Sequence, residues 1–462
     1  MPSMSILSRA PLAPALTGLA SAALLAALCA PAAVSAPPAH APAHGVDRGA
    51  ATQRAVPAVE VTTDNETPVL YDSEEGGNAS GDDPAIWVDA QDSANSIVVV
   101  TAKEGGLRVY DLDSNELQAV AAAEAPREDA AAGRYNNVDI AYGVPLGGER
   151  VDVAVVSDRY NDQVRFFAID PAGARAQTPL TEVTAADLPF LFHADRAGVD
   201  TEQTAYGLAV WQPRQGGTYV VVTQEGTTAL TLVEVMEQDG ALGYVPVDTV
   251  SMPAQFDLPD GTVWTPCEEP GVGPQFEGVA VDRRTGTLFA AQEDVGLWEI
   301  GLSTQGFTGK QGLIDRVKDF GVHDRFDPET EECEPIDPAD EGVGGSLLEA
   351  DAEGVDIYYG RGANGYVVVS SQGDDSFAVY ERNGRHAPVG SFRVRGVDGV
   401  DDIHGSDGLA IASVPVGEYT RGLLVTHDEP ESGPGVDDEQ DPTNFSYVDV
   451  GDVLDALGLR GR

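Results

Sequence analysis

The chain has 462 residues, enough for several domains or one large repetitive domain. It carries 76 acidic and 27 basic residues, a net charge of −49, which excludes nucleic acid and anionic membranes as partners because like charges repel. Solubility at high salt accounts for most of these carboxylates. Many of them nevertheless gather around short motifs, and such oxygen-rich clusters favour Ca²⁺ over transition metals.

Residues 1–36 have the features of a secretory signal peptide. Arg9 is followed by an alanine-rich apolar run that is too short to span a membrane, and a small-x-small site predicts cleavage after Ala36. A lipoprotein anchor at Cys29 is the weaker interpretation, because leucine precedes it. Residues 37–56 are rich in Pro and Ala, and we expect a disordered linker there. The sequence therefore predicts a secreted protein.

The remaining chain, 57–462, consists of short β-branched runs separated by Gly, Asp and Pro, which indicates an all-β fold. One unit recurs six times as a small polar motif, an apolar strand, a turn and a second apolar strand. The motifs are DDPAIWVD (82–89), NNVDIAYG (136–143), TAYGLAVW (204–211), FEGVAVD (276–282), AEGVDIYYG (352–360) and SDGLAIAS (406–413). This predicts a six-bladed β-propeller with four-stranded antiparallel blades, because radial packing buries both faces of each second strand. A stacked β-sandwich array is the alternative, but it would not keep the motif in phase.

In a propeller the innermost strands converge on the axis, so a motif at one end of every inner strand builds a ring around one mouth of the channel. Taken singly, each polar residue is most simply a turn or solvent-facing residue, but the set repeats in phase. The residues expected at this mouth are Asp82, Asp83, Asn137, Glu277, Asp351, Glu353 and Asp407.

Two basic residues occupy the end of the second strand in the first two units, Lys103 and Arg159. The chain has only three lysines, so a base at an acidic mouth suggests that an anion is held there. The alternative is that both residues only balance neighbouring acids. The corresponding positions later in the chain are Gln224-Glu225, Glu293-Asp294, Gln372-Gly373 and His427-Asp428.

After the predicted signal peptide two cysteines remain, Cys267 and Cys333, both in Pro/Glu-rich insertions. In an exported protein we expect one disulfide joining the two loops, and two isolated cysteines are too few for a zinc site.

These motifs resemble those of the β-propeller phytases, which are alkaline Ca²⁺-dependent phosphatases of inositol hexakisphosphate. The resemblance covers about residues 60–450 and rests on DDPAIWVD, NNVDI, SDR, EGVAVD with AAQED, EGVDIYYG, GYVVVSSQGDDSFAVYER and NFSYVDV. It implies an exported 3-phytase-type enzyme, a monomer with several structural and catalytic calcium ions. It also implies that a strand near VPAVEVTT closes the ring beside NFSYVDV.

The resemblance further implies roles for individual residues. Lys103 and Arg159 would grip phosphate, and the catalytic set would be Lys103, Arg159, Tyr206, Glu277 and Glu293. The metal ligands would be Asp83, the carbonyl of Val138, Tyr206, Glu277, Glu293, Asp351, Glu353, Gln372 and Asp401.

The chain departs from the family pattern at two positions where lysine is usual, Glu104 and Glu225. Both changes remove positive charge from the phosphate-binding face, for which calcium or an arginine could compensate. The cysteine-containing insertions, 257–275 and 323–348, are further departures, and we expect them to form a lip over the same face.

A multi-calcium site would reconcile an anionic protein with a polyanionic substrate, because carboxylates gather Ca²⁺ and the ions face the phosphates. A metal-activated water would attack phosphorus, and carboxylates that must stay ionised predict a neutral-to-alkaline optimum. The sequence has no Ser/Cys nucleophile motif, and we interpret the scattered histidines (His323, His386, His404 and His427) as surface or structural. A calcium-dependent propeller lactonase or a non-enzymatic calcium-stabilised binding module are the alternatives.

Overall fold

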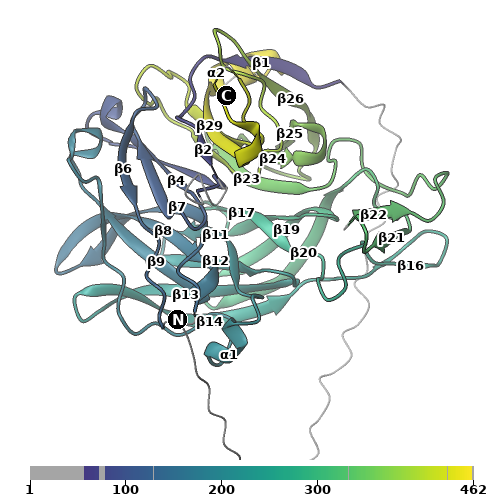
Figure 1. The fold of residues 1–462 in the computed structure, drawn as a ribbon, viewed down its shortest axis with the longest axis horizontal. Helices are drawn as coiled ribbons and strands as arrows, with labels where there is room; N and C mark the ends of the chain where they lie inside the picture. Colours follow the sequence, from purple (N-terminus) through teal and green to yellow (C-terminus); the bar gives the residue numbers. More distant parts are fainter. Residues whose placement is uncertain (1–56, 72–78, 128–129, 331, 434, 460–462) are drawn as a thin grey trace, which may run out of the picture. The chain divides into compact units, whose positions relative to one another are not determined.

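The computed structural model describes residues 57–71, 79–127, 130–330, 332–433 and 435–459, all within one compact unit, Ala50–Arg462. The predicted signal peptide, 1–36, and linker, 37–56, lie outside the described residues. Six sheets surround a common axis, and each contains four antiparallel strands, so the predicted six-bladed β-propeller is confirmed (Figure 1).

The blades follow one another along the chain. Blade 1 comprises β3 (Pro84–Trp87), β4 (Ile97–Thr101), β5 (Leu107–Tyr110) and β6 (Glu116–Val120); blade 2 comprises β7 (Tyr135–Leu146), β8 (Glu149–Asp158), β9 (Gln163–Ile169) and β10 (Leu180–Glu182). Blade 3 comprises β11 (Ala205–Trp211), β12 (Tyr219–Gln224), β13 (Ala229–Gln238) and β14 (Ala241–Ser251); blade 4 comprises β17 (Phe276–Asp282), β18 (Thr287–Gln292), β19 (Gly296–Ser303) and β20 (Gly306–Arg316). Blade 5 comprises β23 (Ala352–Tyr359), β24 (Gly365–Ser371), β25 (Ser376–Glu381) and β26 (Pro388–Gly396); blade 6 comprises β27 (Leu409–Ala412), β28 (Leu423–Asp428) and β29 (Pro442–Asp449), completed by β2 (Leu70–Tyr71).

Helices are few and short in the described residues. The α-helices are α1 (Arg196–Val199) and α2 (Val450–Ala456), and the 3-10 helices are η1 (Ser93–Asn95), η2 (Arg159–Asn161), η3 (Gly173–Arg175), η4 (Gln372–Asp374) and η5 (Asp438–Gln440). Within these described ranges, none of the helices has the length and apolar character needed to cross a bilayer.

The apolar second strands form the middle of each blade. In β4 every residue of the sequence IVVVT is buried, because blades pack against both of its faces. The inner strands touch in the order β3, β7, β11, β17, β23, β27 and back to β3, which closes the ring (Figure 1). The burial of β-branched side chains between blades is therefore the main stabilising contribution to the ring.

A glycine in the repeated motif is required by this close packing. A Cβ on Gly207 would lie 1.9 Å from the carbonyl oxygen of Glu277, and one on Gly278 would lie 2.2 Å from that of Glu353. Since no side chain fits at such distances, the glycine lets each inner strand approach the start of the next one.

The ring closes differently from the expectation. The strand near VPAVEVTT, β1 (Val59–Thr63), pairs in parallel with β26 as a fifth strand of blade 5. It is β2 that pairs with β29, the strand that contains NFSYVDV. The Thr63 hydroxyl donates a 2.5 Å hydrogen bond to the Tyr447 carbonyl, so the chain turns from one blade to the next just after β1.

The two insertions form small hairpins outside the blades. One contains β15 (Phe256–Asp257) and β16 (Val263–Trp264), and the other contains β21 (Asp324–Asp327) and β22 (Glu332–Pro335). A disulfide joins Cys267 to Cys333, as predicted. Figure 1 shows β16, β21 and β22 together at the right edge of the view.

Candidate active site

The strand register aligns the six blades residue by residue. The first two strands of blades 1 to 6 pair Pro84 with Val100, Val138 with Val156, Leu208 with Val222, Val279 with Ala290, Val355 with Val369 and Leu409 with Thr426. The residue two positions before the first member of each pair lies at the same end of each inner strand. This inner row is Asp82, Asn136, Tyr206, Glu277, Glu353 and Asp407.

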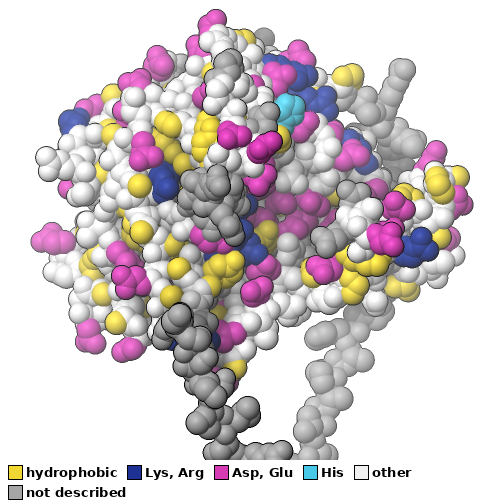
Figure 2. Space-filling model, viewed as in Figure 1, with side chains coloured by type: hydrophobic (Ala, Val, Ile, Leu, Met, Phe, Trp, Pro, Cys, Tyr) yellow, Lys and Arg dark blue, Asp and Glu magenta, His cyan; other side chains and the backbone are white. Residues whose placement is uncertain are grey.

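The same register gives an outer row, three positions after the second member of each pair. It is Lys103, Arg159, Glu225, Glu293, Gln372 and Glu429. Together the two rows define the acidic mouth of the channel. Figure 2 shows Asp and Glu side chains gathered in a hollow near the middle of the face in view.

In blade 6 the register corrects the expectation. The sequence placed His427 and Asp428 at the position of Lys103, but Thr426 pairs with Leu409 and so corresponds to Val100. Glu429 is therefore the counterpart of Lys103, one residue beyond the His427-Asp428 pair.

Three glutamates from neighbouring blades form the centre of the site. Carboxylate oxygens of Glu277, Glu293 and Glu353 all lie within 4.8 Å of one another, and the side chains are buried. Burial, and then the charge of Glu277, raises the pKa of both Glu293 and Glu353 well above the ordinary value. Glu293 Oε1 and Glu353 Oε2 are buried without a hydrogen-bond partner. Such a group requires either protons or a cation, so the donor set fits a hard metal ion.

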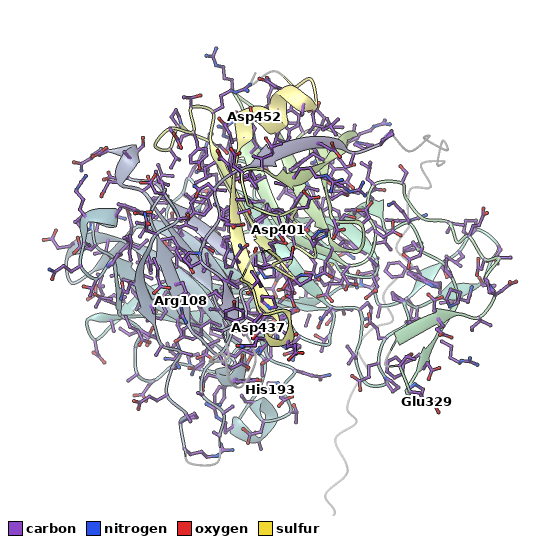
Figure 3. The ribbon with its side chains drawn as sticks, turned by 45° about the horizontal axis from the view of Figure 1, so that its top comes forward. Arg108, His193, Glu329, Asp401, Asp437 and Asp452 are labelled. Atoms are coloured by element: carbon purple, nitrogen blue, oxygen red, sulfur yellow. A yellow bond between two sulfur atoms is a disulfide. The ribbon has the colours of Figure 1, made fainter. Side chains whose placement is uncertain are left out.

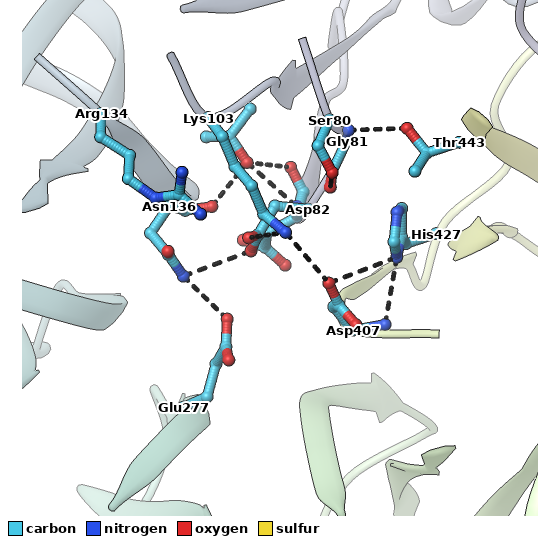
Figure 4. A network of polar contacts seen from close by, with 12 residues as sticks. Ser80, Gly81, Asp82, Lys103, Arg134, Asn136, Glu277, Asp407, His427 and Thr443 are labelled. Carbon is cyan, nitrogen blue, oxygen red and sulfur yellow. Dashed lines mark hydrogen bonds and ion pairs between the residues drawn. The ribbon is translucent and has the colours of Figure 1, made fainter. Parts of the chain in front are cut away.

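Lys103 lies at the same mouth, and Figure 4 shows it together with Glu277 of the triad. Its Nζ is 3.6 Å from Asp82 Oδ2 and 3.9 Å from Asp407 Oδ2. Burial lowers the pKa of Lys103, but Asp82, Asp407 and Glu429 outweigh this effect and raise it, so the ammonium stays charged. Burial raises the pKa of Asp407 to about 8 despite the opposing effect of Lys103.

Asn136 links the basic and acidic parts of the mouth. Its Nδ2 donates to Glu277 Oε1 at 2.8 Å, and its Oδ1 accepts from Arg159 Nη1 at 3.0 Å (Figure 4 shows the first contact). The Arg159 guanidinium also lies 4.8 Å from the centre of the Tyr206 ring. Burial and then Glu277 raise the pKa of Tyr206, so its hydroxyl stays protonated.

The two charge departures are neutralised inside the protein. Glu225 pairs with Arg159 through two contacts, one of them Nε to Oε2 at 3.1 Å. Glu104 pairs with Arg134. The negative charge of Glu104 is therefore neutralised by an arginine with no expected role in phosphate binding. The charge of Glu225 is instead neutralised by Arg159, the arginine that was expected to bind phosphate.

Asp351 and Gln372 lie beside the triad. Burial and then Asp294 raise the pKa of Asp351 to about 7, and Asp351 also raises the pKa of Glu293. Gln372 Nε2 donates to Asp407 Oδ1 at 2.7 Å. The side-chain oxygen of Gln372, Oε1, can then serve as a metal ligand. The insertion at 257–275 reaches this region through Glu268, whose pKa is raised by burial and by Asp351.

Asp401 is not brought to the triad. It belongs to a separate group with Glu66 and Glu431, whose carboxylate oxygens lie within 4.8 Å of one another. Asp401, which is labelled in Figure 3, follows β26 and precedes β27 in the chain, and its Oδ2 accepts hydrogen bonds from the backbone N–H and hydroxyl of Ser432. One oxygen of each of the three acids is buried and unpartnered, so this group fits a second cation site.

Asp83 and Val138 are in contact, but through the backbone N–H of Val138 rather than its carbonyl oxygen. The Val138 N–H donates to Asp83 Oδ2 at 3.0 Å, so Asp83 connects the inner strands of blades 1 and 2. Asp139 and Asp356 likewise accept from Val210 and Ile411 of the following blades.

Sequence reasoning missed several residues of the mouth. Asn136 was passed over for its neighbour Asn137, and Glu429 for His427. His427 is fully buried, and its Nδ1 accepts from the Asp407 N–H at 3.2 Å, which supports the structural interpretation of this histidine. The positions of Asn136 and Glu429 follow from the residue pairing between the first two strands of each blade, whereas similarity between the sequence motifs does not reveal them.

The geometry can therefore combine cation binding and anion binding at one mouth. Comparison with known proteins agrees: the sequence profile described as phytase matches residues 22–246 and 325–460. The chain belongs to the phytase family. A 3-phytase of Bacillus subtilis (strain 168) is 28% identical over 404 residues, 86% of each chain. The profile match omits 247–324, so Glu277 and Glu293 are placed by the strand register.

Solved structures resemble the chain only loosely. A Lactobacillus plantarum protein has a TM-score of 0.35 at 16% identity, covering 65% of this chain and 67% of its own. BBS1N in complex with ARL6DN has a TM-score of 0.38 at 8% identity, covering 80% of this chain and 79% of its own.

Proposed function

We propose that this phytase-family hydrolase is an exported, monomeric, calcium-dependent enzyme of the 3-phytase type that releases phosphate from inositol hexakisphosphate. The observation that carries the proposal is the buried triad of Glu277, Glu293 and Glu353 facing two cationic side chains, Lys103 and Arg159. A metal-assisted reaction on a phosphate ester needs carboxylates that are free to bind the metal ion. It also needs basic side chains at the same mouth to hold the phosphate.

Calcium is the cation that this donor set favours, because it takes six to eight oxygen ligands and tolerates irregular geometry. The triad, together with Tyr206, Asp351 and Gln372, would hold the catalytic ions. Structural ions would be held by Asp83 with the Val138 carbonyl, and by Asp401 with Glu66 and Glu431. Bound calcium would supply charge neutralisation and a coordinated water of lowered pKa.

The chain's own residues orient and hold the phosphate. Lys103 remains an ammonium because Asp82 and Asp407 flank it, and it can donate to phosphoryl oxygens without losing its charge. Arg159 is fixed by Asn136 on one side and Tyr206 on the other, which presents the guanidinium with little loss of freedom. Burial raises the pKa of both Glu293 and Glu353, so protons compete with a cation for these groups as the pH falls, in keeping with a neutral-to-alkaline optimum.

The test is phosphate release from inositol hexakisphosphate at about pH 7–8, with Ca²⁺ or with a chelator, a range set by carboxylates that must stay ionised. Wild type should release phosphate only with Ca²⁺. Glu277→Gln should lose this activity while its circular dichroism spectrum stays unchanged. Glu149→Gln, at an exposed position in blade 2, is the matched control and should behave as wild type.

Two results would count against the proposal. Release that is unaffected by the chelator would refute the calcium requirement. Normal release by Glu277→Gln would refute the site while leaving the family assignment untouched.

Export is tested separately. We propose that the signal peptide is cleaved after Ala36, so the mature protein recovered outside the cell should begin at Pro37. Intact-mass measurement of that protein decides the point. A mass that includes residues 1–36 would contradict it.

A further inference from the structure

The inner strands that carry acids to one mouth carry arginines to the other. Glu277 is the second residue of β17 and Arg283 directly follows the end of that strand, while Glu353 is the second residue of β23 and Arg361 lies just beyond its end. Six strand residues span about 20 Å, so these arginines lie at the opposite end of the channel. This far mouth comprises Arg214 after β11, Arg283 and Arg284 after β17, and Arg361 after β23.

All four of these arginines are exposed, and among the described residues none has a carboxylate within ion-pair distance. The acids nearest to them are already engaged. Asp282 accepts two hydrogen bonds from Arg382, at 2.9 and 3.0 Å. Asp356, inside the channel, accepts from the N–H groups of Ile357 and Ile411, although Arg283 is close enough to lower its raised pKa.

Tyr359, the last residue of β23, holds the arginines together. The guanidinium carbons of Arg283 and Arg284 lie 4.4 and 5.4 Å from the centre of its ring, and that of Arg382 lies at 4.7 Å. Arg382 is buried and bound to Asp282, so it is structural. The other two stack on the ring with their N–H groups free for a ligand.

A pocket of about 290 Å³ adjoins this cluster. It is lined by Tyr358, Tyr359, Gly360, Arg361, Ser413, Pro415, Thr420 and Arg421. Two arginines and an exposed threonine hydroxyl line it, and it has no carboxylate. In a chain with 76 acidic residues, a pocket whose only charged lining residues are arginines is an unusual local environment. Arg421 is held by Asp455, so Arg361 is the cation most available within it.

We propose that the far mouth is a second anion-binding site, separate from the acidic mouth, that binds phosphate groups in the pocket lined by Arg361 and Tyr359, beside which Arg283 stacks on the Tyr359 ring. Guanidinium groups match phosphate because their planar donors make paired hydrogen bonds to its oxygens. The chain's overall charge repels anions at long range, so the site acts only at short range and requires no calcium. Free orthophosphate and a phosphorylated inositol share the chemistry that this site recognises.

The test is isothermal titration calorimetry of the full chain at low ionic strength with excess EDTA, with orthophosphate and inositol hexakisphosphate as separate titrants. Chelation leaves the acidic mouth without cations, so binding there is suppressed. Wild type should bind at least one titrant. The Arg283→Gln/Arg361→Gln double variant should bind it at least about tenfold more weakly, because each charge-assisted hydrogen bond contributes measurably to affinity.

Arg325→Gln is the matched control, since Arg325 is an exposed arginine on β21 of the insertion. It should bind as wild type does. Binding of orthophosphate identifies a single-phosphate site, and binding of inositol hexakisphosphate alone identifies a site for several phosphates; either supports the proposal. Absence of binding by wild type, unchanged binding by the double variant, or equal weakening by Arg325→Gln would overturn it. None of these results depends on turnover at the acidic mouth.

Discussion

The two mouths of the channel are built from the two ends of the same strands, yet their charges are handled in opposite ways. At the acidic mouth Glu277, Glu293 and Glu353 are buried, and none of them forms an ion pair with a basic side chain of the described residues. At the far mouth Arg283 and Arg361 are exposed to water. A buried charge without a partner is costly, whereas an exposed one is solvated. The acidic mouth therefore depends on a bound cation, and the far mouth is stable without a ligand.

The largest effect should come from neutralising one acid of the triad. Glu353→Gln should lower calcium-dependent phosphate release by about 100-fold or more, because a carboxylate that binds the catalytic ion contributes several kcal/mol. Glu349→Gln is the matched control from the same stretch, since Glu349 pairs with Lys318 and is not among the triad. Steady-state assays of both variants check this. Similar activities in the two would remove the distinction between the triad and ordinary surface acids.

The next effect concerns stability and pH. In the folded protein the pKa values of Glu293 and Glu353 are raised by burial, that of Asp351 to about 7 and that of Asp407 to about 8. The folded state therefore keeps protons that the unfolded chain loses near pH 4, so raising the pH from about 4 to about 8 destabilises the metal-free protein. Bound Ca²⁺ should reverse this trend, because it binds the ionised groups.

Thermal unfolding at pH 5 and pH 8, with EDTA or with Ca²⁺, measures it. In EDTA the midpoint should fall by about 5 °C or more between the two pH values, and Ca²⁺ should raise it mainly at pH 8. A metal-free protein that is more stable at pH 8 than at pH 5 would contradict the buried, unpaired triad.

A smaller effect is expected from freeing Arg159. Glu225→Gln removes its ion-pair partner, so KM for inositol hexakisphosphate should fall about three- to fivefold with little change in kcat, the range for a partly exposed pair. Glu104→Gln is the comparison, because Glu104 pairs with Arg134 and not with Arg159. Its KM should change less. An unchanged KM for Glu225→Gln would mean that Arg159 does not contact substrate.

The smallest effect should come from the far mouth. The Arg283→Gln/Arg361→Gln variant should keep kcat/KM for inositol hexakisphosphate within about twofold, because roughly 20 Å separates the mouths and the Debye length is about 8 Å at physiological salt. A larger loss would show that the two mouths are coupled through the channel.

The fold could be predicted from the sequence because its signal is periodic. Six copies of one motif predict the number of blades. The glycine in the EGV motif of blade 4, Gly278, marks the point where this inner strand lies against the next one. Lys103 and Arg159 stand out in the sequence for the same reason, because each follows the end of a second strand, β4 or β8. Glu429 was missed because the threonine of the second strand has a different place in blade 6. Thr426 pairs with Leu409 and so corresponds to Val100 of blade 1, not to Thr101.

Other features could not be predicted because they depend on contacts between distant residues. Asp401 joins Glu66, which precedes the first blade, and Glu431, which lies in a loop of the last. No local pattern connects these three positions. The far mouth was missed for a similar reason: Arg283 and Arg361 belong to different blades, and Tyr359 alone connects them, since Arg283 stacks on its ring and Arg361 lines the same pocket as Tyr359.

The closure of the ring has a consequence for how the protein is made. The segment with β1 and β2 leaves the ribosome before any blade exists, yet β1 pairs with β26 and β2 pairs with β29, near the end of the chain. These strands must remain unpaired throughout synthesis. Pairing across such a separation in sequence is slow because a long loop has to close first. The first strands to be synthesised are thus among the last to find their partners, and blade 6 lacks its outer strand until translation is almost complete.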